Sequence, residues 1–428
     1  MHLTLRLLLG CLAVALSGCQ RDIAAPPAPA AQPVAEKAFY ETSFERKPDA
    51  AVLEALGRKL FSDPSLSVSG RQACASCHSP AHAYGPPNAL SVQPGGAKLT
   101  DQGQRAAPSL MYRQGTPPFS EHFNDTDGDD GADQGPTGGR TWDGRVSSAH
   151  EQAALPLLSP LEMGNADPAA AVARLRSSPF ATDFRTAFGE HVLDDVPKAW
   201  NGLLWALEVF QQSPADFYPY SSKYDAFLRH QTTLSPQEKR GLALFNDPRK
   251  GNCAQCHPSA IKRGTFPLFT DEGLLALGVP RNRRITANRD PAWFDMGLCG
   301  PMRTDLKTHT EYCGAFKTPS LRNAARRRSF FHNGVFHHLE DVVRFYAQRD
   351  SHPQRFYPTG ADGRVERFDD LPTALRGNVA SDPPFGRRPG SEPTLNEKEI
   401  ADLVAFLKTL NDGYLTPTAP PSQTPPRH

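Results

Sequence analysis

The chain has 428 residues, 39% of them hydrophobic and 22% charged, which is long enough for two or three domains with apolar cores. Its formal net charge of +1 excludes the bulk electrostatic attraction expected of a nucleic-acid-binding protein or of one drawn to acidic membranes. The 41 prolines are concentrated near the two ends and in loops, so the folded segments are expected between them.

The N-terminus resembles a bacterial export signal. A basic start precedes an apolar run over residues 7–16, which is too short to span a membrane. The run ends in LSGC, the pattern of a lipobox with Cys19 as the lipidated first residue; the alternative is an ordinary signal peptide cut nearby. We predict a signal peptide over residues 1–18 and a lipid-anchored Pro/Ala linker over residues 19–38. Gln20 favours outer-membrane sorting in a Gram-negative cell, so the chain is expected to face the periplasm.

Cys74, Cys77 and His78 have the spacing C-x-x-C-H. This spacing is typical of covalent haem attachment, with the histidine as one axial ligand of the iron. A lone C-x-x-C also fits a redox dithiol or half of a zinc site, but neither explains the histidine directly after the second cysteine.

The motif occurs twice, within a longer internal repeat. The segments starting at Gly57 and Gly241 both read G-x-x-L-F-x-D-P before they reach C-x-x-C-H. The second copy holds Cys253, Cys256 and His257. Because the repeat puts each motif in its own domain, it argues against one zinc ion bound by both. We therefore predict two covalently bound c-type haems.

A predicted helix precedes each motif. In the first, Val52, Leu56 and Leu60 fall on one face. In the second, Ser235 is the expected N-cap and Glu238 its capping-box partner.

Each half is also predicted to close with a helix, over residues 196–211 and 395–410, and no alternating strand pattern of any length occurs. The expected fold is mainly α, with two cytochrome c-like haem domains and long loops. We place the N-terminal domain at residues 39–222, the C-terminal domain at 223–414 and a disordered tail at 415–428.

Two cysteines, Cys299 and Cys313, remain once the signal, lipid and haem cysteines are assigned. In an exported protein, two leftover cysteines close in sequence are expected to pair, and two inert buried thiols are the alternative. The second axial ligands are left open by the residues alone, because a downstream Met or His is usual. Met111 could serve the first haem or belong to a core, and Met296 or Met302 could serve the second.

Longer segments carry a family resemblance. Trp142 opens WDGRVSSAHEQAALPLLSPLEMG, and FKTPSLRNAARRRSFFHNGVFHHLEDVVRFY starts at Phe316. With the two haem motifs, these segments resemble the bacterial di-haem cytochrome c peroxidase and MauG family over about residues 39–414. In that family the second haem's distal ligand ends the LEDVVRFY-like segment and is Met in ordinary peroxidases but Tyr in MauG. Tyr346 stands there.

The resemblance therefore implies Tyr346 as ligand of the second haem, in place of Met296 or Met302. An anionic oxygen ligand stabilises oxidised iron, so this haem is expected to have a low potential. The alternative is that Tyr346 is an interfacial aromatic and a methionine binds instead.

For the first haem, ordinary members carry a displaceable His sixteen residues after the motif His, where this chain has Pro94. His82 lies in the same loop but only four residues from His78, too close to reach the other haem face. The implied iron is open or water-bound, which is where peroxide can bind.

The resemblance also assigns a pocket above that iron. Glu162 is the expected acid/base, Gln152 orients peroxide and Pro156 forms the wall. Trp142 matches an indole between the haems that would pass electrons. The alternatives are capping or solvated residues for the polar pair and a buried anchor for the indole.

Arg322 is a candidate partner of a haem propionate, and His332 is expected to support the site without binding iron. Calcium between the domains is doubtful, because Ala106, Arg327 and Ser329 stand at the positions that would supply its ligands. The acidic segment that begins at Asn124 lacks the closing Glu of an EF-hand and is expected to be a solvated insertion.

The function that the resemblance implies is reduction of hydrogen peroxide at the N-terminal haem. Electrons would reach it through the C-terminal haem from a periplasmic donor, a cytochrome c or a cupredoxin. The alternative is a MauG-type oxidase that modifies residues of a partner protein. A non-enzymatic two-haem electron carrier is a third possibility, and it would want both irons six-coordinate. No nucleic-acid partner is expected, and membrane contact would come from the lipid at Cys19.

Overall fold

The computed structural model describes residues 37–123 and 133–415. The chain divides into two compact units, Met1–Thr42 and Ser43–His428, and the elements below belong to the second. The predicted signal peptide, lipidation site and most of the linker lie outside the described residues, as do nearly all of the predicted tail and most of the acidic segment. None of the described helices is long and apolar enough to cross a membrane.

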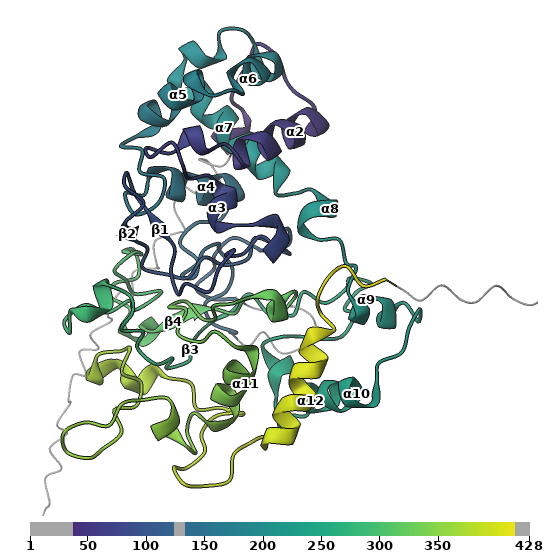
Figure 1. Ribbon diagram of the computed structural model, residues 1–428, viewed down its shortest axis with the longest axis vertical. Helices are drawn as coiled ribbons and strands as arrows, with labels where there is room; N and C mark the ends of the chain where they lie inside the picture. Colours follow the sequence, from purple (N-terminus) through teal and green to yellow (C-terminus); the bar gives the residue numbers. More distant parts are fainter. Residues whose placement is uncertain (1–36, 124–132, 416–428) are drawn as a thin grey trace, which may run out of the picture. The chain divides into compact units, whose positions relative to one another are not determined.

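Helices make up most of the regular secondary structure of the second unit, and strands are few and short (Figure 1). The prediction of a mainly α fold is therefore confirmed. The α-helices are α2 (Ala50–Phe61), α3 (Cys74–Cys77), α4 (Ala149–Leu158), α5 (Pro168–Ser177), α6 (Ala181–Phe188), α7 (Val196–Phe210), α8 (Pro214–Phe217), α9 (Lys223–Leu228), α10 (Pro236–Asn246), α11 (Leu339–Gln348) and α12 (Glu397–Lys408). Strands β1 (Pro94–Gly95) and β2 (Asp101–Gln102) form one antiparallel pair, and β3 (Leu274–Ala276) and β4 (Ala315–Lys317) form another.

Short 3₁₀ turns connect these elements within long loops. They cover Pro64–Leu66, Pro80–His82, Val192–Asp194, Cys253–Gln255, Ala287–Arg289, Thr310–Tyr312, Ala324–Arg326, Pro353–Arg355 and Thr373–Asn378.

The internal repeat folds into two equivalent helix pairs. Helix α2 packs on α7 in the first half, and α10 packs on α12 in the second. The repeat glycines lie at the two crossings. A Cβ on Gly57 would lie 2.0 Å from the carbonyl oxygen of Ala206, and one on Gly241 would lie 2.1 Å from that of Asp402. Glycine is required at both places because the two helix backbones approach too closely for any side chain.

The aromatic packing repeats in the same way. Phe61 meets Phe210 edge to face with ring centroids 5.3 Å apart, and Phe245 meets Phe406 likewise at 5.2 Å. These rings extend the apolar core around each helix pair. The two halves therefore share one packing plan, which agrees with the duplication expected from the sequence.

Helix caps confirm the expected start of the helix that precedes the second motif. In α10 the Ser235 side chain accepts from the backbone N–H of Glu238, and the Glu238 carboxylate accepts from the N–H of Ser235. In α2 the buried face contains Leu53, Leu56 and Leu60. The expectation for Val52 was wrong: this side chain is 43% exposed, because Leu53 takes its place on the buried face.

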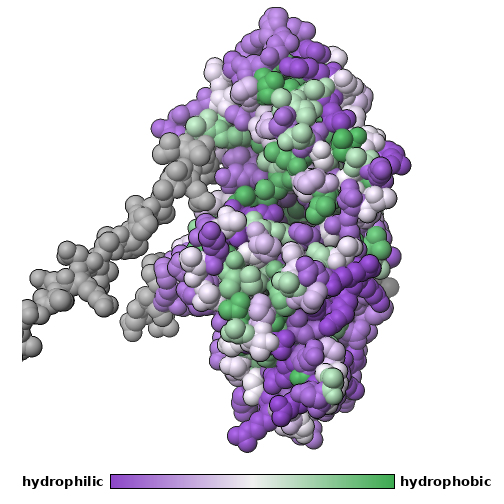
Figure 2. Space-filling model, turned by 90° about the vertical axis from the view of Figure 1, so that its left-hand side faces the viewer, coloured by the Kyte–Doolittle hydropathy of each residue, from purple (hydrophilic) through white to green (hydrophobic). Residues whose placement is uncertain are grey.

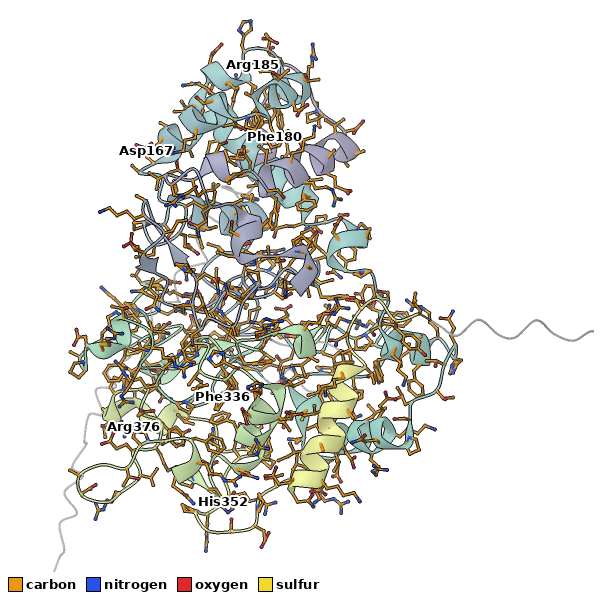
Figure 3. The ribbon with its side chains drawn as sticks, in the orientation of Figure 1. Asp167, Phe180, Arg185, Phe336, His352 and Arg376 are labelled. Carbon is orange, nitrogen blue, oxygen red and sulfur yellow. A yellow bond between two sulfur atoms is a disulfide. The ribbon has the colours of Figure 1, made fainter. Side chains whose placement is uncertain are left out.

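Helix α11 in the second half packs against an aromatic side chain of the loop that precedes it. Phe336, labelled in Figure 3, contacts Phe345 of this helix with ring centroids 5.5 Å apart. Figure 2 shows hydrophilic residues over most of one face of the molecule, with patches of hydrophobic residues between them.

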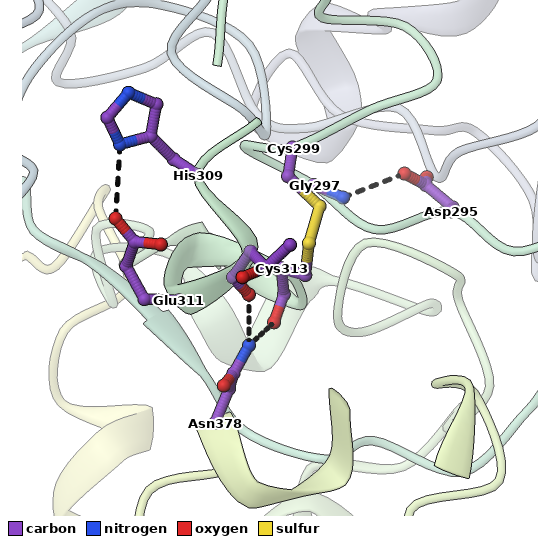
Figure 4. Close-up of a disulfide and its surroundings, with 8 residues drawn as sticks. Asp295, Gly297, Cys299, His309, Glu311, Cys313 and Asn378 are labelled. Atoms are coloured by element: carbon purple, nitrogen blue, oxygen red, sulfur yellow. Dashed lines mark hydrogen bonds and ion pairs between the residues drawn. A yellow bond between two sulfur atoms is a disulfide. The ribbon is translucent and has the colours of Figure 1, made fainter. Parts of the chain in front are cut away.

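The predicted pairing of Cys299 with Cys313 is confirmed by a disulfide (Figure 4). Both cysteines are buried. The side-chain amide of Asn378 donates to the carbonyl oxygen of Cys313 at 3.1 Å and to that of Thr310 at 2.7 Å. The bridge therefore closes a loop directly ahead of β4.

Candidate functional site

Each C-x-x-C-H motif lines a cavity of its own. The first cavity has a volume of about 50 Å³ and the second about 380 Å³, which is within the range of ligand-binding cavities. The first brings together three motif residues and three predicted pocket residues: Cys74, Cys77, His78, Gln152, Pro156 and Glu162. Gln72, Met163 and Gln211 also line it, and sequence reasoning had given none of them a role at this site.

Helix α4 and the turn after it position the pocket residues. Gln152 and Pro156 are four residues apart in α4 and so share a face. The helix ends at Leu158, and its C-cap Ser159 accepts the backbone N–H of Glu162 at 3.0 Å. This turn brings Glu162 back to the cavity that the helix face already lines.

The Glu162 carboxyl group suits proton transfer. Part of its accessible surface lines the cavity, yet the surrounding protein desolvates the carboxyl and raises its pKa above the usual range. Ser159 and the positive charge of Arg145 partly oppose this shift. A carboxyl held closer to neutrality can both accept and return a proton near physiological pH.

The two motif histidines are oriented alike. Nδ1 of His78 lies 3.1 Å from the carbonyl oxygen of Tyr84, and Nδ1 of His257 lies 2.7 Å from that of Phe269. A carbonyl only accepts hydrogen bonds, so Nδ1 carries the proton in both rings and Nε2 is left as a metal ligand. Burial lowers the pKa of His78 to about 4, which favours the neutral imidazole that a metal requires.

The segment around Pro94, where other family members carry a distal histidine, is held by a hydrogen bond. Pro94 begins β1, and its carbonyl oxygen accepts a hydrogen bond from the Gln72 side chain at 3.1 Å. His82 does not line the cavity, and its Nδ1 lies 3.2 Å from the Ser79 hydroxyl. Of the methionines in this half, Met163 lines the cavity and Met111 does not.

Met111 lies elsewhere in the core. Its sulfur accepts a hydrogen bond from Asn323 at 3.4 Å, which favours the core role left open by the sequence.

The second cavity gathers Cys253, Cys256 and His257 with Tyr346 and Trp142. Neither Met296 nor Met302 lines it. Burial raises the pKa of Tyr346, so its phenolate needs a nearby cation such as ferric iron. Among the described residues its hydroxyl has no hydrogen-bond partner, which leaves the oxygen available as a ligand.

Tyr346 is held by aromatic neighbours. Its ring stacks on Phe385 with centroids 5.5 Å apart, and the guanidinium of Arg349 lies 3.7 Å from the Phe385 ring centroid. This stack of cation, phenyl and phenol orients the side chain from α11 toward the cavity. Nothing in the sequence marked Phe385 or Arg349 for this role.

Trp142 also lines the second cavity, and it is buried. Its indole N–H donates to the carbonyl oxygen of Ala106 at 2.7 Å, and the N–H of Ala106 donates to the carbonyl oxygen of His332 at 2.7 Å. An amide carbonyl does not take up a proton, so the indole can lose and regain an electron while it keeps its N–H proton.

Arg322 does not line the second cavity. It forms a buried two-pronged ion pair with Asp225 at 2.9 Å and donates to the carbonyl oxygen of Pro267 at 2.8 Å. The guanidinium is therefore already satisfied by protein groups, which argues against the propionate role.

The donor chemistry of the motifs fits c-type haem better than the two alternatives. No disulfide joins the four motif thiols. Burial raises the pKa of Cys74 to about 12 and of Cys77 to about 11, whereas reactive redox thiols have lowered values. In the described residues no group of three or more His, Cys, Asp or Glu side chains is gathered to hold a metal ion. The two thiols and one available histidine nitrogen of each motif match haem attachment.

Arg327 occupies one of the positions that would supply a calcium ligand in the family. Its guanidinium donates to the carbonyl oxygens of Ser329 and Ala107, each at 3.4 Å. Burial lowers its pKa to about 10. Backbone carbonyls are also ligands that calcium prefers, so a protein cation here competes with the ion.

Known proteins resemble this chain along most of its length. A family model described as di-haem cytochrome c peroxidase matches residues 51–233. The methylamine utilization protein MauG of Paracoccus denitrificans (strain Pd 1222) is 33% identical over 394 residues, covering 88% of this chain and 92% of that protein. Cytochrome-c peroxidase IdrP1 of Pseudomonas sp. (strain SCT) is 30% identical and covers 70% of this chain and 73% of its own length.

A solved structure agrees with these relatives. The crystal structure of the diheme peroxidase BthA from Burkholderia thailandensis has a TM-score of 0.75 and 39% identity, and covers 89% of this chain and 91% of that one. Two attachment motifs in separate cavities agree with the two haems that such proteins carry. This chain belongs to the family of di-haem cytochrome c peroxidases and MauG proteins, and it is an oxidoreductase that acts on peroxide.

Proposed function

We propose that the chain reduces hydrogen peroxide in the first cavity and draws the electrons through the second. The observation that carries this proposal is the shared lining of the first cavity by Glu162, Gln152 and the motif residue His78. Cys74, Cys77 and His78 would hold a haem at the first motif, and its iron would supply the site that binds peroxide and takes up the oxidising equivalents.

The side chains then handle the protons. Glu162 accepts the proton of the peroxide oxygen that is bound and returns it to the outer oxygen, which leaves as water. The raised pKa of this carboxyl suits both steps. Gln152 orients peroxide with its amide. Pro156 lacks an N–H group and closes the apolar side of the cavity.

Trp142 and Tyr346 have roles in electron transfer. Reduction of one peroxide to two waters consumes two electrons and two protons. We propose that Trp142 passes the electrons between the two sites and that Tyr346 is the distal ligand of a haem held by the second motif. The donor is an external periplasmic cytochrome c or cupredoxin.

Rapid mixing of the haem-loaded protein with peroxide tests the proposal. Glu162→Gln keeps the size of the side chain but removes the base, so peroxide cleavage should slow by about 100-fold or more with both haem spectra unchanged. Glu190→Gln is the matched control, because Glu190 is exposed and does not line the cavity. A wild-type rate in Glu162→Gln would refute the pocket assignment.

The first iron is expected to be five-coordinate or water-bound, since Pro94 replaces a ligating His and its segment is held by Gln72. Electron paramagnetic resonance of the ferric protein should show one high-spin and one low-spin haem. Met163 is the competing ligand because it lines the same cavity. Two low-spin signals, one of which disappears in Met163→Leu, would overturn this expectation and favour a simple electron carrier.

A second candidate function is oxidation of residues on a partner protein. Tyr346 in the second cavity and Pro94 in place of a distal His favour it over simple turnover of a small donor. Sequential mixing distinguishes the two. A peroxidase, once oxidised by peroxide, should rapidly consume an added reduced cytochrome c or cupredoxin. A protein-modifying oxidase should stay oxidised with both donors.

We also propose that the protein is a periplasm-facing lipoprotein of the outer membrane. The support is the LSGC segment that ends at Cys19. Fractionation of cells expressing the full chain should find it in the outer membrane, and Cys19→Ser should release it. Recovery of the unaltered chain in the soluble fraction would contradict the proposal.

A further inference from the structure

A polar cluster borders the second cavity on the side of His332. His332 and Asp370 both line the cavity, and each is about 95% buried, with exposures of 5% and 6%. Nε2 of His332 lies 3.3 Å from a carboxylate oxygen of Asp370. The same oxygen accepts a hydrogen bond from the Asn333 side chain at 2.9 Å. Nothing in the proposed mechanism uses this cluster.

The other carboxylate oxygen of Asp370 is unsatisfied. This oxygen, Oδ1, has no hydrogen-bond partner, and Nη1 of Arg281 also has none, although the two atoms are only 3.6 Å apart. The remaining donors of Arg281 are committed to the carbonyl oxygens of residues 288, 290 and 293. A buried carboxylate with one oxygen unpaired is costly, and a proton on that oxygen removes most of the cost.

The electrostatics around Asp370 agree with this arrangement. Burial raises the pKa of its carboxyl, and His332, Asn333 and Arg281 oppose the rise. These three groups have the largest opposing effects on the pKa of Asp370. Burial and the neighbouring groups therefore act in opposite directions on the proton affinity of Asp370. A change of one charge in the cavity can shift that affinity.

The cluster is also connected to the electron path. The His332 ring is stacked on Phe316 with centroids 3.5 Å apart and the rings nearly parallel, and Phe316 lines the same cavity. The His332 carbonyl accepts the N–H of Ala106, whose own carbonyl accepts the indole N–H of Trp142. Asp370 thus lines the same cavity as Trp142, and His332 connects the two through a hydrogen-bonded chain.

We propose that Asp370, supported by His332, takes up one proton when the second haem is reduced and releases it when that haem is oxidised. The external donor would supply one electron to a haem held at this cavity, and solvent would supply the proton, which would form an O–H bond on the Asp370 carboxylate. Oxidation reverses both transfers. The inference rests on the proposed function in taking a haem to occupy this cavity, with Tyr346 as its ligand and an external donor to reduce it.

Two other buried charges at the cavity are already paired, and two further lining carboxylates, Asp271 and Asp382, are exposed to solvent. Asp295 accepts two hydrogen bonds from Arg105 at 2.6 and 2.7 Å. Lys317, whose pKa burial lowers to about 8, lies 2.5 Å from the Glu272 carboxylate. Lys317 is the strongest competitor as a proton site, and the experiment must separate it from Asp370.

The test is a spectroelectrochemical titration of the full haem-loaded protein at a series of pH values. The second haem is identified as the one whose spectrum Tyr346→Phe alters. Its midpoint potential should fall as the pH rises, by as much as about 59 mV per pH unit, which is the potential change for a tenfold change in proton concentration in a one-electron couple. The fall should occur between the pKa of Asp370 in the oxidised protein and its pKa in the reduced protein. In Asp370→Asn this slope should vanish, and the potential should stay at the high value that the wild type reaches at low pH, because Asn resembles the protonated acid.

Asp369→Asn is the matched control. Asp369 is the neighbouring buried carboxylate, but it accepts from the backbone of Arg281 and from the Arg283 side chain and does not line the cavity. This variant should keep the slope. His332→Gln removes a group that lowers the proton affinity of Asp370, so the sloping region should move to higher pH.

Several outcomes would overturn the proposal. A wild-type potential that is independent of pH does so even where Asp370→Asn fails to fold. A slope that survives Asp370→Asn and disappears in Lys317→Met assigns the proton to the lysine. A uniform shift of potential in Asp370→Asn with the slope intact assigns Asp370 a structural role. None of these results depends on the peroxide reaction, so failure here is distinct from failure of the proposed function.

Discussion

At the scale of single residues, the proposed function assigns proton transfer to a side chain of the first cavity and electron transfer to a side chain of the second. Glu162 is a desolvated carboxyl in the first cavity, and Trp142 is an indole whose N–H is held by a carbonyl at the second. The two side chains line different cavities. Substitutions at these positions should therefore give different kinetic phenotypes.

Trp142→Phe should leave cleavage of peroxide at the first cavity largely intact, because no proton donor or acceptor there is changed. It should slow oxidation of the second haem and turnover of the donor, because the oxidisable indole is lost. Rapid mixing with peroxide, followed at the spectrum of each haem, measures both steps. Trp205→Phe is the control, since Trp205 packs between Phe44 and Phe188 away from both cavities. Unchanged turnover in Trp142→Phe would mean that the indole only packs.

Tyr346→Phe should remove or replace the low-spin ferric signal of the second haem and raise its potential. The reason is loss of an anionic oxygen ligand that stabilises the oxidised state. Electron paramagnetic resonance and redox titration of the variant measure the two effects. Met296→Leu and Met302→Leu serve as controls, because neither methionine lines the cavity. If one of these changes the signal while Tyr346→Phe does not, the ligand assignment fails.

At the scale of secondary-structure elements, the two haem halves depend on close helix crossings. Gly241 allows α10 to approach α12 so closely that a Cβ would lie 2.1 Å from a backbone oxygen. The same relation holds between Gly57 of α2 and α7. The crossings carry the aromatic clusters next to which each attachment motif lies.

Gly241→Ala should therefore force the α10 and α12 backbones apart. Overpacking of this kind costs about 1–3 kcal/mol of stability, and thermal unfolding of the haem-loaded protein should occur at lower temperature. Gly377→Ala is the control, because a Cβ there meets no atom within 4 Å. Equal melting temperatures for the two variants would contradict the steric argument.

At the scale of the whole molecule, contacts of Arg327 join segments that are far apart in the sequence. Its guanidinium reaches the carbonyl oxygen of Ala107 from the loop that follows Arg326. The guanidinium engages carbonyl oxygens of the kind that calcium prefers, so we expect no calcium requirement at this place.

Dialysis against a chelator should therefore leave the haem spectra, the peroxide reactivity and the melting temperature unchanged. The physical reason is that the carbonyl oxygens at this position are already engaged by a guanidinium. Metal analysis of the purified protein provides the direct check. Stoichiometric calcium whose removal lowers the melting temperature would contradict the prediction.

The sequence by itself determined the attachment chemistry, because C-x-x-C-H is a local motif in which every participating group lies within five residues. It also determined the duplicated helices, because their apolar faces and caps repeat at short range, and the disulfide, because only two cysteines were left to pair. Val52 was misplaced because the face of a short helix is ambiguous by one residue.

Only the tertiary structure decided which distant side chains meet. The family resemblance had paired Glu162 with the first motif and Tyr346 with the second, but the structure added Met163 and Gln211 to the first cavity and paired Arg322 with Asp225 away from the second. The cluster of His332, Asp370 and Arg281 has no sequence signal, since its members come from three loops separated by dozens of residues. Local patterns constrain neighbours along the chain, whereas hydrogen bonds and burial in a cavity depend on how the loops between helices pack.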